Sequence, residues 1–416
     1  MEAIMEQTNS KQEAKQPEQS KWIEYIALAS VPLVLVLGNS MLVPILPDVK
    51  RQLSLTQLQT SLIITLFSLA AGIIIPIAGY LSDRYGRKKI IIPALILYGA
   101  AGVLAGFGAL WKSYPILIAA RAIQGIGAAG TAPIAMALVG DLYKGATESQ
   151  ALGLIEASNG AGKVASPILG SLLALWSWTV PFFAFPVFCA GSLVAMIFLI
   201  KEPKASADKK KIPLSDYLKN IKQIFKQKGH WLIPAFISGS LALFILFGIL
   251  FYLSDILEEA PYTIKGVKKG LVLAIPLLGM VITSFSTGSL IKKNGVLIRW
   301  LMNIGLALMA VSLCLTIFFS RNLYVFIGLI TLSSIGTGLL LPCLNTMITG
   351  TVEKAERGMI TSLYSSMRFI GVALGPPLFS WMMDISHKMI FISVTSLSAI
   401  ALVLVFFFIK PDKKVA

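Results

Sequence analysis

The sequence predicts an all-α integral membrane protein of twelve spanning helices, arranged as two pseudo-symmetric six-helix bundles. Three observations support this prediction: the composition, the lengths of the apolar stretches and an internal repeat. Of the 416 residues, 56% are apolar and only 13% are charged, and the mean hydropathy is +0.78. Because a soluble domain carries about a quarter charged residues, the composition indicates that lipid rather than water surrounds most of the chain.

Twelve apolar stretches have about 20 residues each, the length that crosses a bilayer as a helix. They cover residues 23–46, 58–81, 90–110, 115–139, 151–175, 180–200, 231–253, 268–291, 298–319, 322–349, 358–382 and 388–409. Helices are the expected form, because a helix satisfies its own backbone amides within lipid. The stretches do not alternate in the way that a transmembrane β-strand does, so a β-barrel is excluded.

The distribution of basic residues predicts the orientation. If both termini are cytoplasmic, the tails and loops on that side hold 25 Lys and Arg residues, and those on the other side hold 8. The positive-inside rule therefore predicts a multi-pass protein of the cell membrane with both termini in the cytoplasm. The net charge of +16 is explained by this topology, so nucleic acid is not an expected partner.

An internal repeat relates the two halves of the chain at an offset of about 209 residues. The aligned positions include Gly79 with Gly288, Gly86 with Gly295, Pro133 with Pro342, and Pro167 with Pro376. We predict bundles over residues 23–200 and 231–409, a linker with a basic amphipathic helix over 201–230, and cytoplasmic tails over 1–22 and 410–416. Parallel repeats place a substrate cavity between the halves near the midplane, which indicates a transporter.

The loop after the second stretch carries the sharpest motif, GYLSDRYGRKK over residues 79–89. It resembles the loop signature G-x-L-x-D-R-x-G-R-[KR]-[KR] of major facilitator superfamily transporters. The resemblance extends to the whole chain in architecture and implies the major facilitator fold. It also implies a gate at the inner ends of the two halves, formed by Gly79, Asp83, Arg84, Gly86 and Arg87. The alternative is a basic loop that only sets topology.

Two further segments resemble signatures of the drug:proton antiporter branch of this superfamily. Residues 117–129 read LIAARAIQGIGAA, and the resemblance implies that the buried Arg121 takes part in proton coupling. Residues 162–171 read GKVASPILGS and resemble the antiporter signature G-x-x-x-G-P-x-x-G-G, with Ser166 and Ser171 in place of two glycines. The family associates this motif with export, whereas ordinary glycine-rich helix packing is the alternative. The expected packing residues are Gly162, Pro167, Gly170, Gly371, Gly375 and Pro376.

Four charged residues lie deep inside the apolar stretches, away from their ends: Arg121, Glu156, Lys163 and Arg368. Ionisable residues at membrane depth are functional candidates, because they are costly to keep there. We predict that Glu156 carries the proton and that Arg121 tunes its pKa, since burial and a nearby cation shift a carboxyl in opposite directions. A fixed ion pair of Glu156 with Lys163 or Arg121 is the alternative. The residues expected to line the substrate cavity are Asn39, Gln124, Lys163 and Arg368.

These features predict a secondary transporter that exports a drug or a secreted metabolite, such as a siderophore, in exchange for protons. The resemblance to the superfamily implies that it works as a monomer. An excess of buried cations favours a neutral or anionic cargo. No cofactor is expected. A metal is not expected, because the three cysteines form no CxxC pair and the two histidines suggest no metal site. ATP is not expected either, because residues 157–164 resemble a P-loop but end in Val164, where magnesium binding needs Ser or Thr. The alternative is a proton-coupled uptake symporter. A more remote alternative is a membrane enzyme or receptor, although no catalytic constellation is recognisable.

Overall fold

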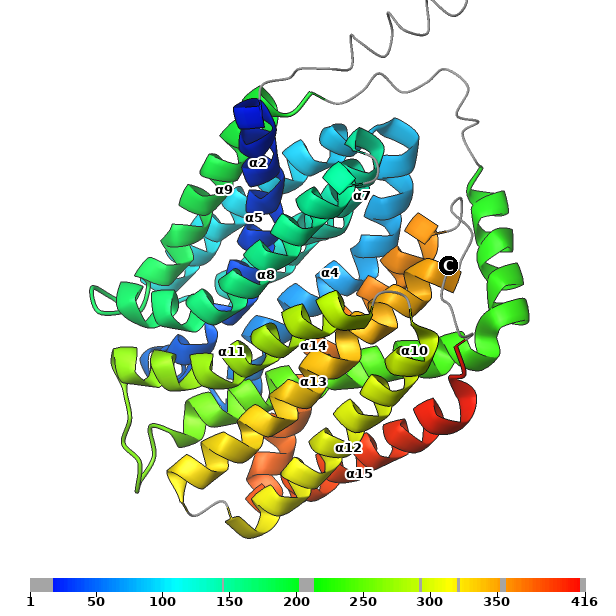
Figure 1. Cartoon of the computed structure of the whole chain (residues 1–416). Coiled ribbons are helices and arrows are strands. Elements are labelled where there is room, and N and C mark those ends of the chain that lie inside the picture. The colour runs from blue at the N-terminus through cyan, green and yellow to red at the C-terminus, as the bar shows by residue number, and fades with distance from the viewer. Residues whose placement is uncertain are drawn as a thin grey trace, which may run out of the picture.

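The computed structural model describes residues 18–143, 146–201, 213–291, 294–319, 322–351 and 357–411, and its regular elements there are all helical (Figure 1). A helix occupies each of the twelve predicted spans, so the predicted fold class is confirmed. Ten spans qualify as transmembrane by length and hydropathy. The other two are α8 and α14, which are more polar because they carry Glu156, Lys163 and Arg368.

The helices divide into the two halves that the repeat predicts. The first half comprises α2 (Glu18–Ser40), η1 (Val43–Ile45), α3 (Leu46–Gln52), α4 (Gln57–Tyr85), α5 (Arg87–Leu110), α6 (Tyr114–Ala129), α7 (Ala132–Leu142), α8 (Ala146–Leu173) and α9 (Val180–Leu199). The second half comprises α10 (Leu214–Ile256), α11 (Gly266–Ile291), α12 (Gly295–Phe319), α13 (Leu323–Thr351), α14 (Arg357–Ile385) and α15 (His387–Phe408). Figure 1 shows the first half, which runs from blue at α2 to green at α9, beside the second half, which runs from green at α10 to red at α15.

Two spans predicted as single helices are broken. The first span passes from α2 through η1 to α3, and Pro44 and Pro47 stand at the starts of the latter two elements. Proline lacks the amide hydrogen that would continue the preceding helix. The fourth span changes from α6 to α7 at Gly130 and Thr131, and Pro133 lies in the first turn of α7. Such breaks release backbone carbonyls that neighbouring side chains can bind.

The predicted amphipathic helix continues into the seventh span, so that α10 is 43 residues long. Tyr217 near its start is 9% exposed and packs edge-on against Tyr80, with ring centroids 5.0 Å apart. Figure 1 shows the first part of α10 at the edge of the molecule. The helix therefore contacts the end of α4, next to the loop motif of residues 79–89, which we call the gating motif after its predicted role. Residues 202–212 of the linker and 1–17 of the N-terminal tail lie outside the described residues.

Two helix pairs join the halves: α4 packs on α14, and α8 packs on α11. Between α4 and α14, the Thr65 hydroxyl donates to the Ala373 carbonyl at 2.8 Å. Between α8 and α11, Gly270 lies against the Pro167 carbonyl, where a side chain would collide. The two polar spans thus lie at the boundary between the halves rather than at the lipid surface. This position reduces the cost of their charges, because they need not face hydrocarbon.

Candidate functional site

One face of α8 carries Glu156, Asn159 and Lys163. Helical periodicity places these residues between two packing stripes. On one side, the Ser158 hydroxyl donates to a carbonyl of α2 at 2.9 Å. On the other side, Gly160 contacts Val281 of α11. The polar face therefore points into the region between the first half and the second, and it is partly exposed there.

Arg368 occupies the corresponding face of α14. Ser366 binds a carbonyl of α4, and Gly371 lies against the backbone of α10, so two sides of α14 are packed. The exposed Leu374 and Leu378 lie together on another side, as lipid-facing residues do. Arg368 lies away from this apolar side, and its guanidinium is 5.5 Å from the Tyr364 ring. Its Nε is buried without a hydrogen-bond partner.

The polar faces of α8 and α14 form one charged cluster across the two halves. The Lys163 ammonium interacts electrostatically with the Glu156 carboxylate and with the Arg368 guanidinium. The Asn159 amide donates to Glu156 at 3.3 Å, while its own oxygen is buried without a partner. The ion pairs of the described residues do not include Glu156. The cluster thus combines two cations, one unpaired carboxylate and unsatisfied hydrogen-bonding atoms, as a binding site for a polar solute would.

Arg121 is held elsewhere, inside the first half. It is fully buried, and its guanidinium donates to the carbonyls of Ile63 at 3.0 Å and Gly38 at 3.1 Å and to the Gln124 side chain. It also lies 4.4 Å from the centre of the Phe67 ring. The partners of the Arg121 guanidinium are therefore carbonyl oxygens of the backbone and of the Gln124 amide. No described contact joins Arg121 to Glu156.

Asn39 and Gln124, predicted to line the cavity, lie in this same buried layer. Asn39 is 5% exposed and donates to the Ser68 hydroxyl at 3.0 Å, and Gln124 is fully buried. The Asn39 oxygen and the Gln124 nitrogen have no hydrogen-bond partner. Of the predicted cavity residues, Lys163 and Arg368 interact electrostatically with each other, whereas the described hydrogen bonds of Asn39 and Gln124 lie within the first half.

The gating motif forms a turn between α4 and α5. Gly86 joins the helices with φ 109° and ψ 145°, a conformation that L-residues with a side chain rarely adopt. Arg87 pairs with Asp83 and, at 3.1 Å, with Asp141 of α7. Arg84 donates to the Tyr80 hydroxyl at 3.1 Å. These ion pairs lie within the first half. Asp141 lies outside the motif of residues 79–89, so the motif did not predict its pairing with Arg87.

The gating motif meets the second half at Gly79, which lies against the Ser362 side chain of α14. The predicted packing residues also allow close helix approach. Gly162 contacts Leu33 of α2, and Gly170 contacts the Met41 carbonyl. In the second half, Gly371 and Gly375 lie against backbone carbonyls of α10. Pro167 and Pro376 lie inside α8 and α14.

A group of charged residues that sequence reasoning missed lies at the opposite end of the molecule from the gating motif. Glu258, which follows α10, accepts from Arg51 of α3 and from Lys269 of α11. Asp48 also pairs with Arg51. We call Asp48, Arg51, Glu258 and Lys269 the far-end ion network. It ties the first half to the second, and the Lys269 side chain is only 1% exposed.

Electrostatics hold Glu258 in its charged form. Burial raises the pKa of its carboxyl. The Lys269 ammonium and the Arg51 guanidinium together lower this pKa by more than burial raises it, so the net pKa lies below the ordinary value of 4.5. The Glu258 carboxyl is therefore ionised at neutral pH. Arg51 and Glu258 are 207 positions apart in sequence, which explains why no local pattern pointed to the network.

Comparisons with known proteins give the family. The family model of the Major Facilitator Superfamily matches residues 28–297 and 261–416. The chain is 46% identical to the bacillibactin exporter of Bacillus subtilis (strain 168), over 93% of this chain and 96% of the relative. It is 30% identical to the multidrug efflux protein YfmO of the same organism, over 84% of both chains.

Solved structures show the same fold. A bacterial homologue of the human lysosomal transporter Spinster matches with a TM-score of 0.72 at 16% identity, over 94% of this chain and 97% of that one. The human organic anion transporter MFSD10 matches with a TM-score of 0.70 at 19% identity, over 94% and 100%. The twelve helices, the gating motif and the match along the whole chain lead to one assignment. The protein is a multi-pass membrane transporter and belongs to the Major Facilitator Superfamily.

Proposed function

We propose that the protein exports an anionic or neutral organic solute of the siderophore class in exchange for protons, by alternating access. The observation that carries this proposal is the cluster of Glu156, Lys163 and Arg368 between the halves. The relative that is 46% identical is named a bacillibactin exporter, which supports the siderophore class and the export direction. Both termini lie in the cytoplasm, as the distribution of basic residues indicates.

Exchange requires that cargo and proton compete for one group. A cargo hydroxyl that donates a hydrogen bond to ionised Glu156 meets this requirement, because a protonated carboxyl no longer accepts that bond in the same way. An anionic group of the same cargo would pair with Lys163 and Arg368. Protonation of Glu156 from the outer side would then release the cargo, and deprotonation on the inner side would allow the next cargo to bind.

Proton-coupled uptake is the second candidate, and the same electrostatics favour it for a different cargo. An anion without hydroxyl donors is repelled by ionised Glu156 and binds better when that carboxyl is protonated. Such a cargo would travel with the proton rather than against it. The direction of proton movement for a given cargo therefore distinguishes exchange from cotransport.

The test uses everted membrane vesicles whose interior is acidified by respiration and monitored with a pH-sensitive dye. Iron-free bacillibactin is added to vesicles with the intact protein, Glu156→Gln or Glu148→Gln. Glu148 is the matched control, because it is a carboxylate in the first turn of the same helix. We expect proton release with the intact protein and Glu148→Gln, and none with Glu156→Gln.

The outcomes separate the parts of the proposal. Proton release that persists in Glu156→Gln would mean that exchange occurs through another group. Cargo-dependent acidification instead of release would support cotransport. Absence of any response to bacillibactin or to a panel of anionic drugs would refute the proposed cargo class. Radiolabelled cargo uptake into the same vesicles would show whether transport continues without proton coupling.

A further inference from the structure

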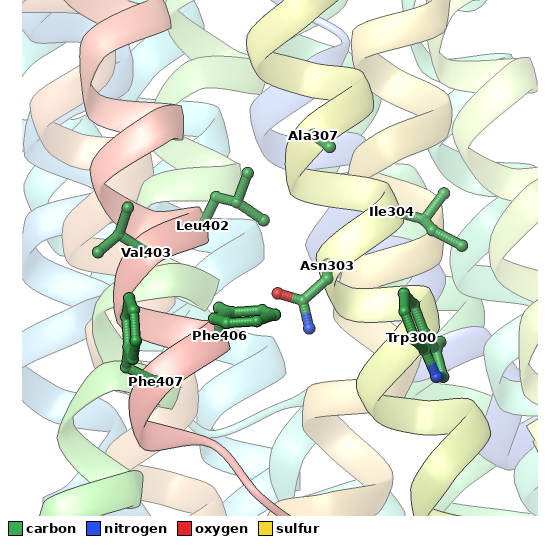
Figure 2. Close-up of a pocket in the computed structure, with 8 residues that line it drawn as sticks. All are labelled: Trp300, Asn303, Ile304, Ala307, Leu402, Val403, Phe406 and Phe407. Atoms are coloured by element: carbon green, nitrogen blue, oxygen red, sulfur yellow. The ribbon is translucent and has the colours of Figure 1, made fainter.

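An apolar groove of about 400 Å³ runs along the outer side of the second half, between α12 and α15. Figure 2 shows its walls, with Trp300, Asn303 and Ile304 from α12 and Leu402, Phe406 and Phe407 from α15. The Trp300 side chain is 63% exposed and that of Phe407 is 61% exposed. Because α12 and α15 are membrane-spanning helices, these exposed aromatic side chains face the bilayer.

The groove lies close to one surface of the membrane. Helix α12 begins at Gly295 and α15 ends at Phe408. The lining residues belong to the first turns of α12 and the last turns of α15, so they lie near the end of the molecule that carries the chain termini. Tryptophan is enriched at this depth, where its ring meets both lipid tails and headgroups. A lipid in the groove would therefore have its headgroup beside the first turns of α12.

Arg299 stands at the rim of the groove. Its guanidinium donates to the Phe406 carbonyl at 3.1 Å and lies 5.5 Å from the Phe406 ring. An arginine carries five N–H donors, so one bond to the helix end leaves donors available. The exposed Lys410 follows the end of α15. The rim is therefore positively charged, while the groove itself is apolar.

Part of this arrangement is explained if Arg299 only caps the C-terminal end of α15 by binding a backbone carbonyl there. In the first half, the Lys88 ammonium donates to the Ile197 carbonyl at 2.8 Å and the Ile200 carbonyl at 2.7 Å. Ile197 corresponds to Phe406 at the repeat offset of 209, so both halves cap the last helix with a basic side chain. This correspondence makes Lys88 a control for capping without the groove between α12 and α15.

We propose that the groove binds an anionic phospholipid from the leaflet on the side of the chain termini. One acyl chain lies against Trp300, Ile304 and the phenyl rings of α15, and Arg299 binds the phosphate. An apolar groove next to the fixed guanidinium of Arg299 fits a phospholipid by shape and by charge. The cytoplasmic leaflet, which the proposed topology places at this end, is the one whose anionic lipids attract basic residues.

Native mass spectrometry of the purified full-length protein tests this proposal, with phosphatidylglycerol and phosphatidylethanolamine titrated separately. For Arg299→Gln, we expect about fivefold weaker binding of phosphatidylglycerol, the effect of one basic residue near the surface. Ala307→Phe fills the groove and keeps Arg299, and it should also weaken binding. Lys88→Gln should bind as the intact protein does.

Four results would overturn the inference. The first is that Arg299→Gln and Ala307→Phe both retain phosphatidylglycerol as the intact protein does. The second is that Lys88→Gln weakens binding as much as Arg299→Gln, and the third is that phosphatidylethanolamine binds equally well. The fourth is that transported cargo displaces the bound lipid, because the groove would then be a cargo site. If Arg299→Gln fails to fold, Ala307→Phe decides the question, since it leaves the cap of α15 intact.

Discussion

Replacing Glu258 by Gln should release the far-end ion network and favour the conformation that is open at this end. In the structure, the Glu258 carboxylate accepts from both Arg51 and Lys269 and bridges the two halves. The substitution keeps the shape of the side chain and removes its charge. Lys269, at 1% exposure, would then be a buried cation without its main counter-ion. Opening the far end would relieve this cost by admitting water.

The magnitude follows from the burial of the pair. Removing one partner of a buried ion pair costs about 3–5 kcal/mol, because the other charge stays desolvated. Asp48 also attracts the Lys269 ammonium and offsets part of this loss. We therefore take the lower value, about 3 kcal/mol, as the shift between the closed and open forms. At about 1.4 kcal/mol per tenfold change, the population ratio should change by about a hundredfold.

The assay is a distance measurement by pulsed electron paramagnetic resonance. Spin labels on Gln52 and Lys265 report the separation of the halves, because both residues are exposed and lie on opposite sides of the network. Glu258→Gln should shift the distance distribution to longer values, whereas Glu259→Gln, an exposed neighbour, should not. An unchanged distribution in Glu258→Gln, with the fold intact, would refute the reasoning that this network holds the far end closed.

The same network predicts a dependence on pH. The Glu258 pKa is lowered in the closed form, so the carboxylate stabilises this form at neutral pH, and the effect is lost as the pH falls through the lowered pKa. The labelled protein should therefore open by this route only below pH 4.5, the ordinary value for a glutamate. Opening at pH 6 would assign the transition to another group.

Three substitutions test the packing and the buried arginine by their effect on thermal unfolding in detergent. Gly170→Ala should destabilise by about 1–3 kcal/mol, because the new methyl group meets the Met41 carbonyl, whereas Gly153→Ala on the same helix has open space and should be neutral or stabilising. Gly86→Ala should cost about 1–3 kcal/mol through backbone strain. Arg121→Gln should destabilise by about 1–3 kcal/mol for each carbonyl left unpaired, and Arg121→Lys should restore part of the loss. Unfolding temperatures of Gly170→Ala, Gly86→Ala and Arg121→Gln equal to that of the intact protein would contradict these assignments.

Sequence reasoning located the polar residues along the chain but did not establish which of them meet. Glu156 and Lys163 are seven positions apart on one helix, so helical periodicity alone put them on one face. Arg121 was predicted to tune the pKa of Glu156, which requires the two side chains to lie near each other. The structure instead surrounds it with α2, α4 and α6 and gives it carbonyl partners. Depth along the membrane is readable from hydropathy, whereas direction around a bundle depends on which helices are neighbours.

The sequence by itself determined the twelve spans, the two halves and the loop motif of residues 79–89. These are local or periodic properties: lipid requires a long apolar helix, and a repeat offset persists whatever the packing. Only the tertiary structure decided that Lys163 and Arg368 form one cluster and that Glu258 joins Arg51 and Lys269. Arg51 and Glu258 are 207 positions apart, and an ion pair leaves no periodic trace in either segment. Their contact arises from the way in which the two halves pack against each other.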